Sequence, residues 1–369
     1  MAKYFLIAGE ASGDRHAAEL ITQLHRLDSE AQFSGLGGDQ MAAAGCRLHR
    51  HYREMAFMGI VAVLKNLNRV RENFRIAKET LLRERPDALI LIDYPTFNLK
   101  MAAFCHRHLP ETKIIYYIPP KVWAWKRFRI HRIAQLCDLI LGIFPFEPDF
   151  YAKYGYTCTY VGNPTAEQVR GIKNEKLNNT NYIALLPGSR PSEISNCLPT
   201  MLEAARRHND YQIIVTAAPG IEDTFYAPYL RPGETLRRDT YEVVSNARAA
   251  IVNSGTATLE TALLDCPQVA VYHLAAARLL GWIRWAQPLI FQIRFFTLVN
   301  ILSGQETIRE LVANDFTADK IDRELQRLLN DEIYKKNMLA SYEHIRRLLS
   351  TQPAAETAAR RIAALTLPQ

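Results

Sequence analysis

The chain has 369 residues, of which 48% are hydrophobic and 22% charged, a composition that excludes a disordered or low-complexity protein. At roughly 150 residues per domain, this length favours two domains, each with its own core. The 45 Lys and Arg residues exceed the 38 Asp and Glu residues by seven. This excess suits an anionic substrate, a nucleic acid or an acidic membrane surface, and does not choose among them.

Cysteine and apolar patterns narrow the class of protein further. The six cysteines are scattered without a CxxC pair, which indicates reduced thiols in a cytosolic protein and argues against a cysteine zinc site. The apolar start, residues 1–8, is too short for a signal peptide or a membrane span. A second apolar stretch, Trp282–Leu302, contains Arg284 and Arg294, which a spanning helix would have to bury. We therefore expect a soluble protein.

Short apolar and β-branched runs alternate with longer helical patterns, which predicts the parallel strand–helix–strand units of an α/β fold. In the first half we expect strands at Tyr4–Ala8, Gln32–Leu36, Ala88–Ile92, Lys113–Ile118, Leu139–Ile143 and Thr159–Val161. Helical patterns in the same half occupy Asp14–Leu27, Leu67–Glu84 and Ile130–Cys137.

The polar, aperiodic segment Gly171–Asn181 interrupts this pattern and predicts a linker. Further strands are expected at Tyr182–Leu186, Tyr211–Thr216, Ala249–Val252 and Gln268–Tyr272, and helices at Ala318–Leu329, Ile333–Leu349 and Ala354–Leu365. We predict doubly wound domains at 1–165 and 166–330 and a helical tail at 331–369. Because ligands bind beyond the carboxyl ends of parallel strands, a cleft between the domains is the expected site.

Two of the expected strands lead into candidate site residues. The first ends in Gly9-Glu10-Ala11-Ser12-Gly13-Asp14, where glycines permit close approach of a ligand and Ser12 or Asp14 can cap the next helix. A plain strand-to-helix turn explains the same residues. The strand at 88–92 delivers Asp93, which is placed either as a general base or as an acceptor for backbone N–H groups in its loop.

Several nucleotide and metal motifs are missing. Phe33-Ser34-Gly35-Leu36-Gly37-Gly38 lacks the spacing of the dinucleotide fingerprint, and no acidic residue ends the second strand, which disfavours a nicotinamide enzyme. The sequence contains no Walker motif, no Asp-x-Asp and no His-Glu-x-x-His, so phosphoryl transfer and metal-held sugar nucleotides lose support. We expect neither a cofactor nor a metal.

A basic and aromatic run occupies Lys121–Arg129, where four cations alternate with three aromatic residues. This composition suits an anionic head group beside lipid chains, or single-stranded nucleic acid. The alternative is an amphipathic segment whose rings, including those of Trp123 and Trp125, belong to the core.

The second domain contains two loops suited to phosphate. Gly188, Ser189 and Arg190 precede an expected helix, whose free N–H groups and dipole would join the guanidinium in binding an anion. In the second loop Ser254, Gly255 and Thr256 can hold a diphosphate while Glu260 reaches a ribose. For the first loop the alternative is a Pro-Gly turn with a surface arginine. For the second it is a helix capping box built from Thr256 or Thr258 with a nearby Glu, which is compatible with phosphate binding.

Taken together, these motifs resemble lipid-A-disaccharide synthases over nearly the whole chain. The resemblance is carried, in order, by Ala8-Gly9-Glu10-Ala11-Ser12-Gly13-Asp14, Phe33-x-Gly35-x-Gly37-Gly38, Asp93-Tyr94-Pro95-x-Phe97-Asn98, Val122-Trp123-Ala124-Trp125, Pro187-Gly188-Ser189-Arg190-x-x-Glu193-Ile194 and Ser254-Gly255-Thr256-Ala257-Thr258-Leu259-Glu260. It implies a GT-B fold and an inverting transfer of 2,3-diacylglucosamine from UDP to 2,3-diacylglucosamine 1-phosphate. The product would be the β-1,6 disaccharide 1-phosphate of lipid A biosynthesis.

The resemblance also implies roles for individual residues. Asp93 would be the catalytic base, although Glu10 is an alternative. The acceptor cleft would contain Gly9, Glu10, Ser12, Gly13, Asn98, Trp123 and Trp125, and the nucleotide site Gly188, Ser189, Arg190, Ser254, Gly255, Thr256, Glu260, Asn300, Gln305 and Glu306. Two positions depart from the family pattern: Ala62 replaces a usual Glu, and Lys121 replaces a small residue.

The resemblance finally implies partners and a location. Because both substrates carry acyl chains, the enzyme would work at the cytoplasmic face of the inner membrane, with Lys121–Arg132 and Trp282–Phe296 facing the lipid. A homodimer with exchanged C-terminal segments is also implied, and no nucleic acid. The alternatives are another metal-independent GT-B enzyme, such as a UDP-N-acetylglucosamine epimerase or a glycan-chain transferase, and a non-catalytic lipid- or nucleic-acid-binding protein.

Overall fold

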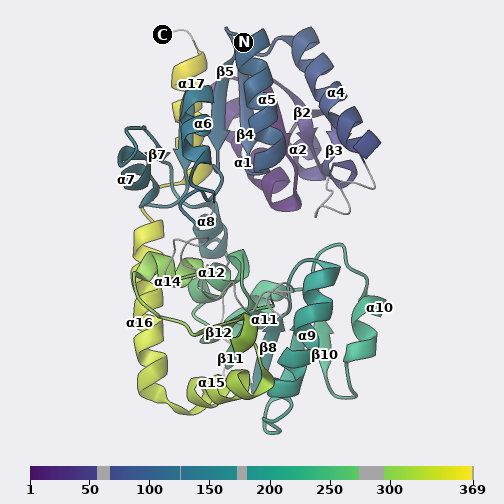
Figure 1. The fold of residues 1–369 in the computed structure, drawn as a ribbon, viewed down its shortest axis with the longest axis vertical. Coiled ribbons are helices and arrows are strands. Elements are labelled where there is room, and N and C mark those ends of the chain that lie inside the picture. The colour runs from purple at the N-terminus through teal and green to yellow at the C-terminus, as the bar shows by residue number, and fades with distance from the viewer. Residues whose placement is uncertain (56–66, 125, 173–180, 274–294, 368–369) are drawn as a thin grey trace. The chain divides into compact units, whose positions relative to one another are not determined.

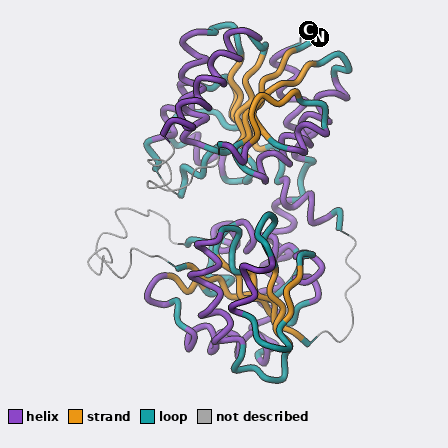
Figure 2. Tube along the Cα trace, turned by 90° about the vertical axis from the view of Figure 1, so that its right-hand side faces the viewer, coloured by secondary structure: helices purple, strands orange, loops and turns teal. Residues whose placement is uncertain are grey.

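The chain folds into two compact units in a computed structural model that describes residues 1–55, 67–124, 126–172, 181–273 and 295–367 (Figure 1). The first unit comprises Met1–Glu167 together with Leu349–Gln369, and the second comprises Gln168–Leu348. Each unit is built on a parallel sheet with helices on both faces (Figure 2). The α/β class predicted from the alternating pattern is therefore confirmed.

The first unit contains a seven-stranded sheet in the order β3-β2-β1-β4-β5-β6-β7. The strands are β1 (Lys3–Ala8), β2 (Gln32–Gly37), β3 (Arg47–His51), β4 (Ala88–Ile92), β5 (Lys113–Tyr117), β6 (Leu139–Gly142) and β7 (Thr159–Tyr160). All neighbouring pairs are parallel, and β4 lies at the centre between β1 and β5, with Ala88 of β4 opposite Tyr4 of β1.

Alternate residues of these strands supply two cores, one on each face of the sheet. Phe5 and Ile7 of β1 pack with the helices on one face, whereas Tyr4 and Leu6 pack on the other. The first face carries α4 (Leu67–Glu84), α5 (Pro95–His108) and α6 (Arg129–Leu136), and the second carries α1 (Ala11–Leu27) and α17 (Ala354–Thr366). Shorter helices are α2 (Asp39–Ala43), η1 (Tyr52–Glu54), α7 (Glu147–Ala152) and α8 (Pro164–Arg170).

The second unit contains a six-stranded parallel sheet in the order β10-β9-β8-β11-β12-β13. Its strands are β8 (Tyr182–Leu186), β9 (Gln212–Thr216), β10 (Thr235–Arg237), β11 (Ala249–Asn253), β12 (Gln268–Tyr272) and β13 (Glu310–Val312). Its helical elements are α9 (Pro191–Ala205), α10 (Asp223–Tyr226), η2 (Ala227–Tyr229), α11 (Thr240–Asn246), α12 (Thr256–Leu263), α14 (Leu298–Ser303), η4 (Ala313–Asp315), α15 (Ala318–Asn330) and α16 (Glu332–Leu349).

The strands expected from the sequence lie within one residue of their predicted bounds, but the strands β3, β10 and β13 were not predicted. Each of these three forms an edge of its sheet. Edge strands are only partly covered and need no continuous apolar run, so the polar segments Arg47–His51, Thr235–Arg237 and Glu310–Val312 carry little strand signal.

The C-terminal helices divide between the units. Helix α16 belongs to the second unit, whereas α17 packs on α1 of the first, where the Thr366 hydroxyl lies 2.9 Å from that of Tyr4. Most of the predicted linker lies outside the described residues, as do Ala62 and most of Trp282–Leu302. In the ranges that the structure describes, no helix combines the length and apolar character needed to span a membrane.

Candidate active site

Both sheets reverse their strand order at a point where two neighbouring loops leave in opposite directions. In the first unit this point lies between β1 and β4, whose loops begin at Gly9 and Asp93. In the second unit it lies between β8 and β11, whose loops begin at Pro187 and Ser254. Ligands of doubly wound sheets bind at such reversal points. The predicted residues of the loops that begin at Gly9, Asp93, Pro187 and Ser254 lie there, whereas Trp123 follows β5, Asn300 lies in α14, and Gln305 and Glu306 lie between α14 and β13.

Asp93 occupies a strained backbone conformation immediately after β4. Its φ is +45°, and that of Tyr94 is +44°, a left-handed region that non-glycine residues rarely adopt. The Asp93 carbonyl accepts hydrogen bonds from Asn98 Nδ2 at 2.8 Å and the Tyr116 hydroxyl at 2.7 Å, and its N–H donates to the Ile118 carbonyl at 3.2 Å. Backbone strain held by surrounding hydrogen bonds in this way is a feature of functional sites.

Four influences set the ionisation of the half-buried Asp93 carboxyl. Burial raises the pKa of Asp93 above its ordinary value, and the charge of Lys121, a hydrogen bond from the Tyr94 N–H and the charge of His16 offset part of this rise. A carboxyl with a raised pKa is a better proton acceptor than an exposed one, so the environment suits a general base. Sequence reasoning placed Lys121 at a lipid surface and missed both His16 and the supporting hydroxyl of Tyr116.

The predicted acceptor residue Asn98 supports Asp93 rather than facing solvent. Its side chain is fully buried, and Nδ2 also donates to the Ile92 carbonyl at 3.2 Å. Asn98 therefore links the end of β4 to the first turn of α5 and positions Asp93. Its Oδ1 is buried and finds no hydrogen-bond partner among the residues that the structure describes.

The loop after β1 packs directly against the loop that carries Asp93. A Cβ atom on Gly9 would lie 2.3 Å from the Tyr94 ring, so only glycine permits this contact. Glu10 is half-buried and Ser12 exposed at the start of α1, whereas Gly13 is buried. Glu10 and Ser12 can therefore meet a ligand beside Asp93, and Gly9 and Gly13 serve packing.

The expectation that Ser12 or Asp14 caps the helix after β1 is wrong. No side chain caps α1, and Asp14 instead accepts hydrogen bonds from the backbone N–H groups of Gly38, Gln40 and Met41 at 2.7–3.1 Å. These groups belong to the start of α2, so Asp14 caps a neighbouring helix. The two glycine loops are thereby joined by a contact that local sequence does not reveal.

Trp123 belongs to the interior of the first unit. Its side chain is buried, and its ring makes edge contacts with Phe144 and Phe146. Its Nε1 donates to Glu147 Oε1 at 3.2 Å. This placement favours the amphipathic interpretation of the segment for Trp123, while Phe128 of the same run is 70% exposed. Trp125 lies outside the described residues.

The loop after β8 is organised by Glu193 near the start of α9. Glu193 accepts a hydrogen bond from the Ser189 N–H at 3.0 Å and pairs with Arg190 at 2.9 Å. Gly188 has a φ of +121°, and a Cβ there would lie 2.6 Å from Glu193 and 2.7 Å from Asn253. The loop after β8 therefore packs against the end of β11, and the Arg190 side chain beside it is partly exposed.

The loop after β11 presents backbone groups to solvent. Ser254 is half-exposed, and Gly255 and Thr256 are exposed at the start of α12. The cap residue of α12 is Gly255, which has no side chain to accept from the first N–H groups, and the Thr258 hydroxyl donates to the Gly255 carbonyl, so the predicted capping box does not form. Glu260, one turn later, accepts a hydrogen bond from the Tyr241 hydroxyl at 3.1 Å.

The third predicted nucleotide segment is held together by Asn300 of α14. The fully buried Asn300 Oδ1 accepts from the N–H groups of Thr307 and Ile308, and Nδ2 donates to the Ile308 carbonyl and to Glu310 Oε1, all at 2.8–2.9 Å. An amide has two acceptor sites and two donors, so its capacity is fully used within the protein. The side chains of the exposed Gln305 and Glu306 bond to Ser341 and Arg309, respectively.

Comparison with known proteins shows which family the chain belongs to. Residues 4–363 match the family model described as lipid-A-disaccharide synthetase. The lipid-A-disaccharide synthase of Myxococcus xanthus is 35% identical, covering 99% of this chain and 98% of the relative, and that of Geobacter sulfurreducens is 34% identical, covering 97% and 95%. The chain belongs to the lipid-A-disaccharide synthase family. It is accordingly a glycosyltransferase of lipid A biosynthesis, and the resemblance stated from its motifs is confirmed.

Solved structures of other proteins share the fold of this family member. A putative UDP-N-acetylglucosamine 2-epimerase from Listeria monocytogenes matches with a TM-score of 0.63 at 12% identity, covering 98% of this chain and 95% of the other. CalG4, the calicheamicin glycosyltransferase, matches with a TM-score of 0.62 at 14% identity, covering 99% and 98%. These likenesses support the expected GT-B fold.

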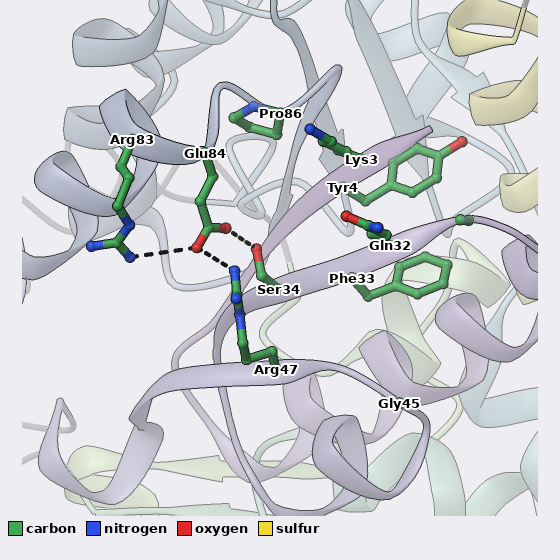
Figure 3. A pocket seen from close by; sticks show the side chains of 11 residues that line it. Lys3, Tyr4, Gln32, Phe33, Ser34, Gly45, Arg47, Arg83, Glu84 and Pro86 are labelled. Atoms are coloured by element: carbon green, nitrogen blue, oxygen red, sulfur yellow. Dashed lines mark hydrogen bonds and ion pairs between the residues drawn. The ribbon is translucent and has the colours of Figure 1, made fainter. Parts of the chain in front are cut away.

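One cavity of this glycosyltransferase lies away from the predicted site. It measures about 540 Å³ and is lined by Lys3, Gln32 and Arg47, which begin β1, β2 and β3 at their amino ends (Figure 3). Glu84 in its wall accepts from the Ser34 hydroxyl and pairs with Arg47, so its charge is satisfied internally. Among the described residues, no group of three or more His, Cys, Asp or Glu side chains is arranged to hold a metal ion.

Proposed function

We propose that this enzyme transfers 2,3-diacylglucosamine from UDP-2,3-diacylglucosamine to the 6-hydroxyl of 2,3-diacylglucosamine 1-phosphate, with inversion at the anomeric carbon. The products are the β-1,6 lipid A disaccharide 1-phosphate and UDP. Family membership supports the reaction class. The observation that carries the mechanism is the strained, half-buried Asp93 at the strand reversal of the first unit.

Asp93 acts as the general base in this proposal. Its carboxylate takes the proton of the acceptor 6-hydroxyl while that oxygen attacks the anomeric carbon and the bond to the UDP oxygen breaks. Attack opposite the leaving group in a single displacement inverts the anomeric configuration. Burial raises the pKa of Asp93, which makes the carboxylate a stronger base. The same rise lowers the fraction of Asp93 that is ionised at a given pH.

The second unit binds UDP through the loops after β8 and β11. The N–H groups at the start of α12 and the guanidinium of Arg190 meet the diphosphate, where they stabilise the negative charge that develops as UDP departs. Glu260 is placed to bind the ribose. Asn300 is a positioning residue in this scheme, because its amide has no free hydrogen-bonding capacity.

The acyl chains of both substrates require contact with a membrane. Each buried CH₂ contributes about 0.8 kcal/mol to membrane affinity, so the substrates stay at the bilayer and the enzyme must reach them there. We propose peripheral attachment at the cytoplasmic face of the inner membrane. The exposed Phe128 and the neighbouring cations of Lys121–Arg132 are suited to anionic lipid. A homodimer remains part of the proposal.

The reaction is tested by incubating purified enzyme with both acylated substrates and following UDP release together with the disaccharide by mass spectrometry. Asp93→Asn is expected to lower kcat by at least about 100-fold while UDP binding by calorimetry persists. Asp149→Asn, at an exposed carboxylate of the same unit, is the matched control and keeps full activity. UDP release without the acceptor would indicate an epimerase or a hydrolase, and near-normal turnover by Asp93→Asn would remove the base assignment.

A further inference from the structure

Tyr94 follows Asp93 directly and shares its unusual backbone conformation. The two residues have φ values of +44° and +45°, so two consecutive non-glycine residues are left-handed. Such a pair is strained and persists only where surrounding contacts hold it. Three hydrogen bonds hold the backbone of Asp93, whereas the contacts that hold Tyr94 are made by its own side chain.

The Tyr94 ring is packed against two parts of the first unit. It lies against the backbone of Gly9 in the loop after β1, where a Cβ atom would come within 2.3 Å of the ring. It also contacts Phe97 of α5 at 5.6 Å between ring centroids, and Phe97 in turn stacks on Phe74 of α4 at 4.4 Å. The ring therefore has little room to turn without displacing one of these neighbours.

The Tyr94 hydroxyl ties the loop after β4 to the segment after β3. It donates a hydrogen bond to the carbonyl of Met55 at 2.9 Å, and Met55 is only 2% exposed. Burial raises the pKa of Tyr94, so the hydroxyl keeps its proton and remains a donor. Strands β3 and β4 are separated in the sheet by β2 and β1, so one side-chain hydrogen bond joins segments from well-separated strands.

The acceptor of this hydrogen bond is itself held in place by Asn73 of α4. The Asn73 side chain is 2% exposed, and its Nδ2 donates to the carbonyl of Glu54, which precedes Met55, at 3.1 Å. Its Oδ1 accepts from Arg50 Nε of β3 at 3.0 Å. Because Asn73 is bonded at both ends, it fixes this segment against α4 and β3 and gives the Tyr94 hydroxyl a partner in a defined position.

We propose that Tyr94 is a positioning residue: its hydroxyl, bonded to the Met55 carbonyl, holds the loop after β4 in the left-handed conformation that places the Asp93 carboxylate. The inference rests on the proposed function, because the position of Asp93 affects the rate only if Asp93 is the base. Tyr94 acts through its neighbour and not by contact with a substrate. Its loss therefore lowers kcat and leaves the binding of both substrates intact.

The test compares Tyr94→Phe with wild type in steady-state assays of the full-length enzyme with both acylated substrates. The variant keeps the ring and removes only the hydroxyl, and urea unfolding verifies that it is folded under the assay conditions. We expect kcat to fall about five- to twentyfold, because a small displacement of a catalytic group slows the reaction strongly, and KM for each substrate to stay within about twofold.

Tyr4→Phe is the matched control. Tyr4 belongs to the same unit and also has one hydroxyl contact of 2.9 Å, to Thr366, but it lies near the amino end of β1, away from the loop that carries Asp93. Its substitution removes a comparable contact and keeps the wild-type kcat. A loss of kcat in Tyr94→Phe alone therefore reports on the base loop and not on general stability.

Two double variants show whether Tyr94 acts through Asp93 and Met55. In an Asp93→Asn background the loss caused by Tyr94→Phe should shrink to less than about twofold, because no carboxylate is left to position. Asn73→Asp loses the donor to the Glu54 carbonyl and keeps the acceptor for Arg50, so it reaches the same hydrogen bond without changing Tyr94. It should lower kcat by a smaller factor, and adding Tyr94→Phe should lower kcat no further than Tyr94→Phe alone.

The inference is overturned if folded Tyr94→Phe keeps kcat within about twofold of wild type or changes only KM. It is also overturned if Tyr4→Phe loses as much activity, or if the loss persists undiminished in either double variant. Near-normal turnover by Asp93→Asn would instead remove the proposed base. Because that single variant leaves Tyr94 unchanged, failure of the proposed function and failure of the positioning role are distinguished.

Discussion

Replacing Asn300 by alanine distinguishes a residue that builds the nucleotide-side loop from one that binds the nucleotide. The four hydrogen bonds of its amide group reach Thr307, Ile308 and Glu310, in the segment that leads from α14 into β13. The shape of this segment therefore depends on Asn300. Alanine removes the whole group and leaves its partners in place.

The expected loss of stability follows from counting which partners remain satisfied. The Thr307 N–H also donates to the Gln305 carbonyl, and Glu310 Oε1 also accepts from Thr297. The N–H and carbonyl of Ile308 lose the only hydrogen-bond partners that the structure describes for them. Each of these two buried groups left unsatisfied costs about 1–3 kcal/mol, so Asn300→Ala should destabilise the second unit by about 2–6 kcal/mol.

The assay combines urea unfolding, with hydrogen exchange of residues 297–312, and calorimetry of UDP binding under conditions where the variant stays folded. Asn300→Asp is the matched variant: it retains the acceptors for Thr307 and Ile308 but places a carboxylate against Glu310. We expect intermediate stability for it, and UDP affinity within about threefold of wild type for the folded protein in both variants. Wild-type stability combined with lost UDP binding would refute the positioning role.

Three further predictions concern single positions. Burial raises the pKa of Glu147 to about 7. Between about pH 4.3, where an unfolded Glu ionises, and pH 7 the folded state holds the extra proton, so stability falls as pH rises by up to about 1.4 kcal/mol per pH unit. Glu147→Gln should abolish this slope in urea titrations, and a slope that survives contradicts the assignment. Gly9→Ala forces a Cβ to within 2.3 Å of the Tyr94 ring and should lower kcat about tenfold and stability by about 1–3 kcal/mol; an unchanged kcat would separate this loop from the site. Gly188→Ala, crowded at 2.6 Å with a φ of +121°, should weaken UDP binding about tenfold by calorimetry. Gly233→Ala, at φ +91° in open space, is its control, and equal effects on UDP affinity would exclude a local role for Gly188.

The central strands and the strand-end loops could be predicted because their signals are local. Ala88–Ile92 and Tyr182–Leu186 are buried along their whole length and read as continuous apolar runs. Asp93 and Gly188 follow such runs directly, so their place at the sheet edges follows from the end of the strand. The edge strand Arg47–His51 was missed because its half-exposed surface tolerates polar residues.

By itself the sequence determined the α/β class, the two parallel sheets, the loops at their carboxyl edges and, through motifs in order along the chain, the family. Only the tertiary structure decided how individual side chains are used. Asp14 caps a helix that begins 25 residues later, and Trp123 is buried against Glu147. The Asn300 side-chain amide hydrogen-bonds to groups of the segment that follows it in the chain. Local patterns report which residues prefer burial or a turn. They do not report which distant group satisfies a buried polar atom, because that choice depends on packing between elements far apart in the chain.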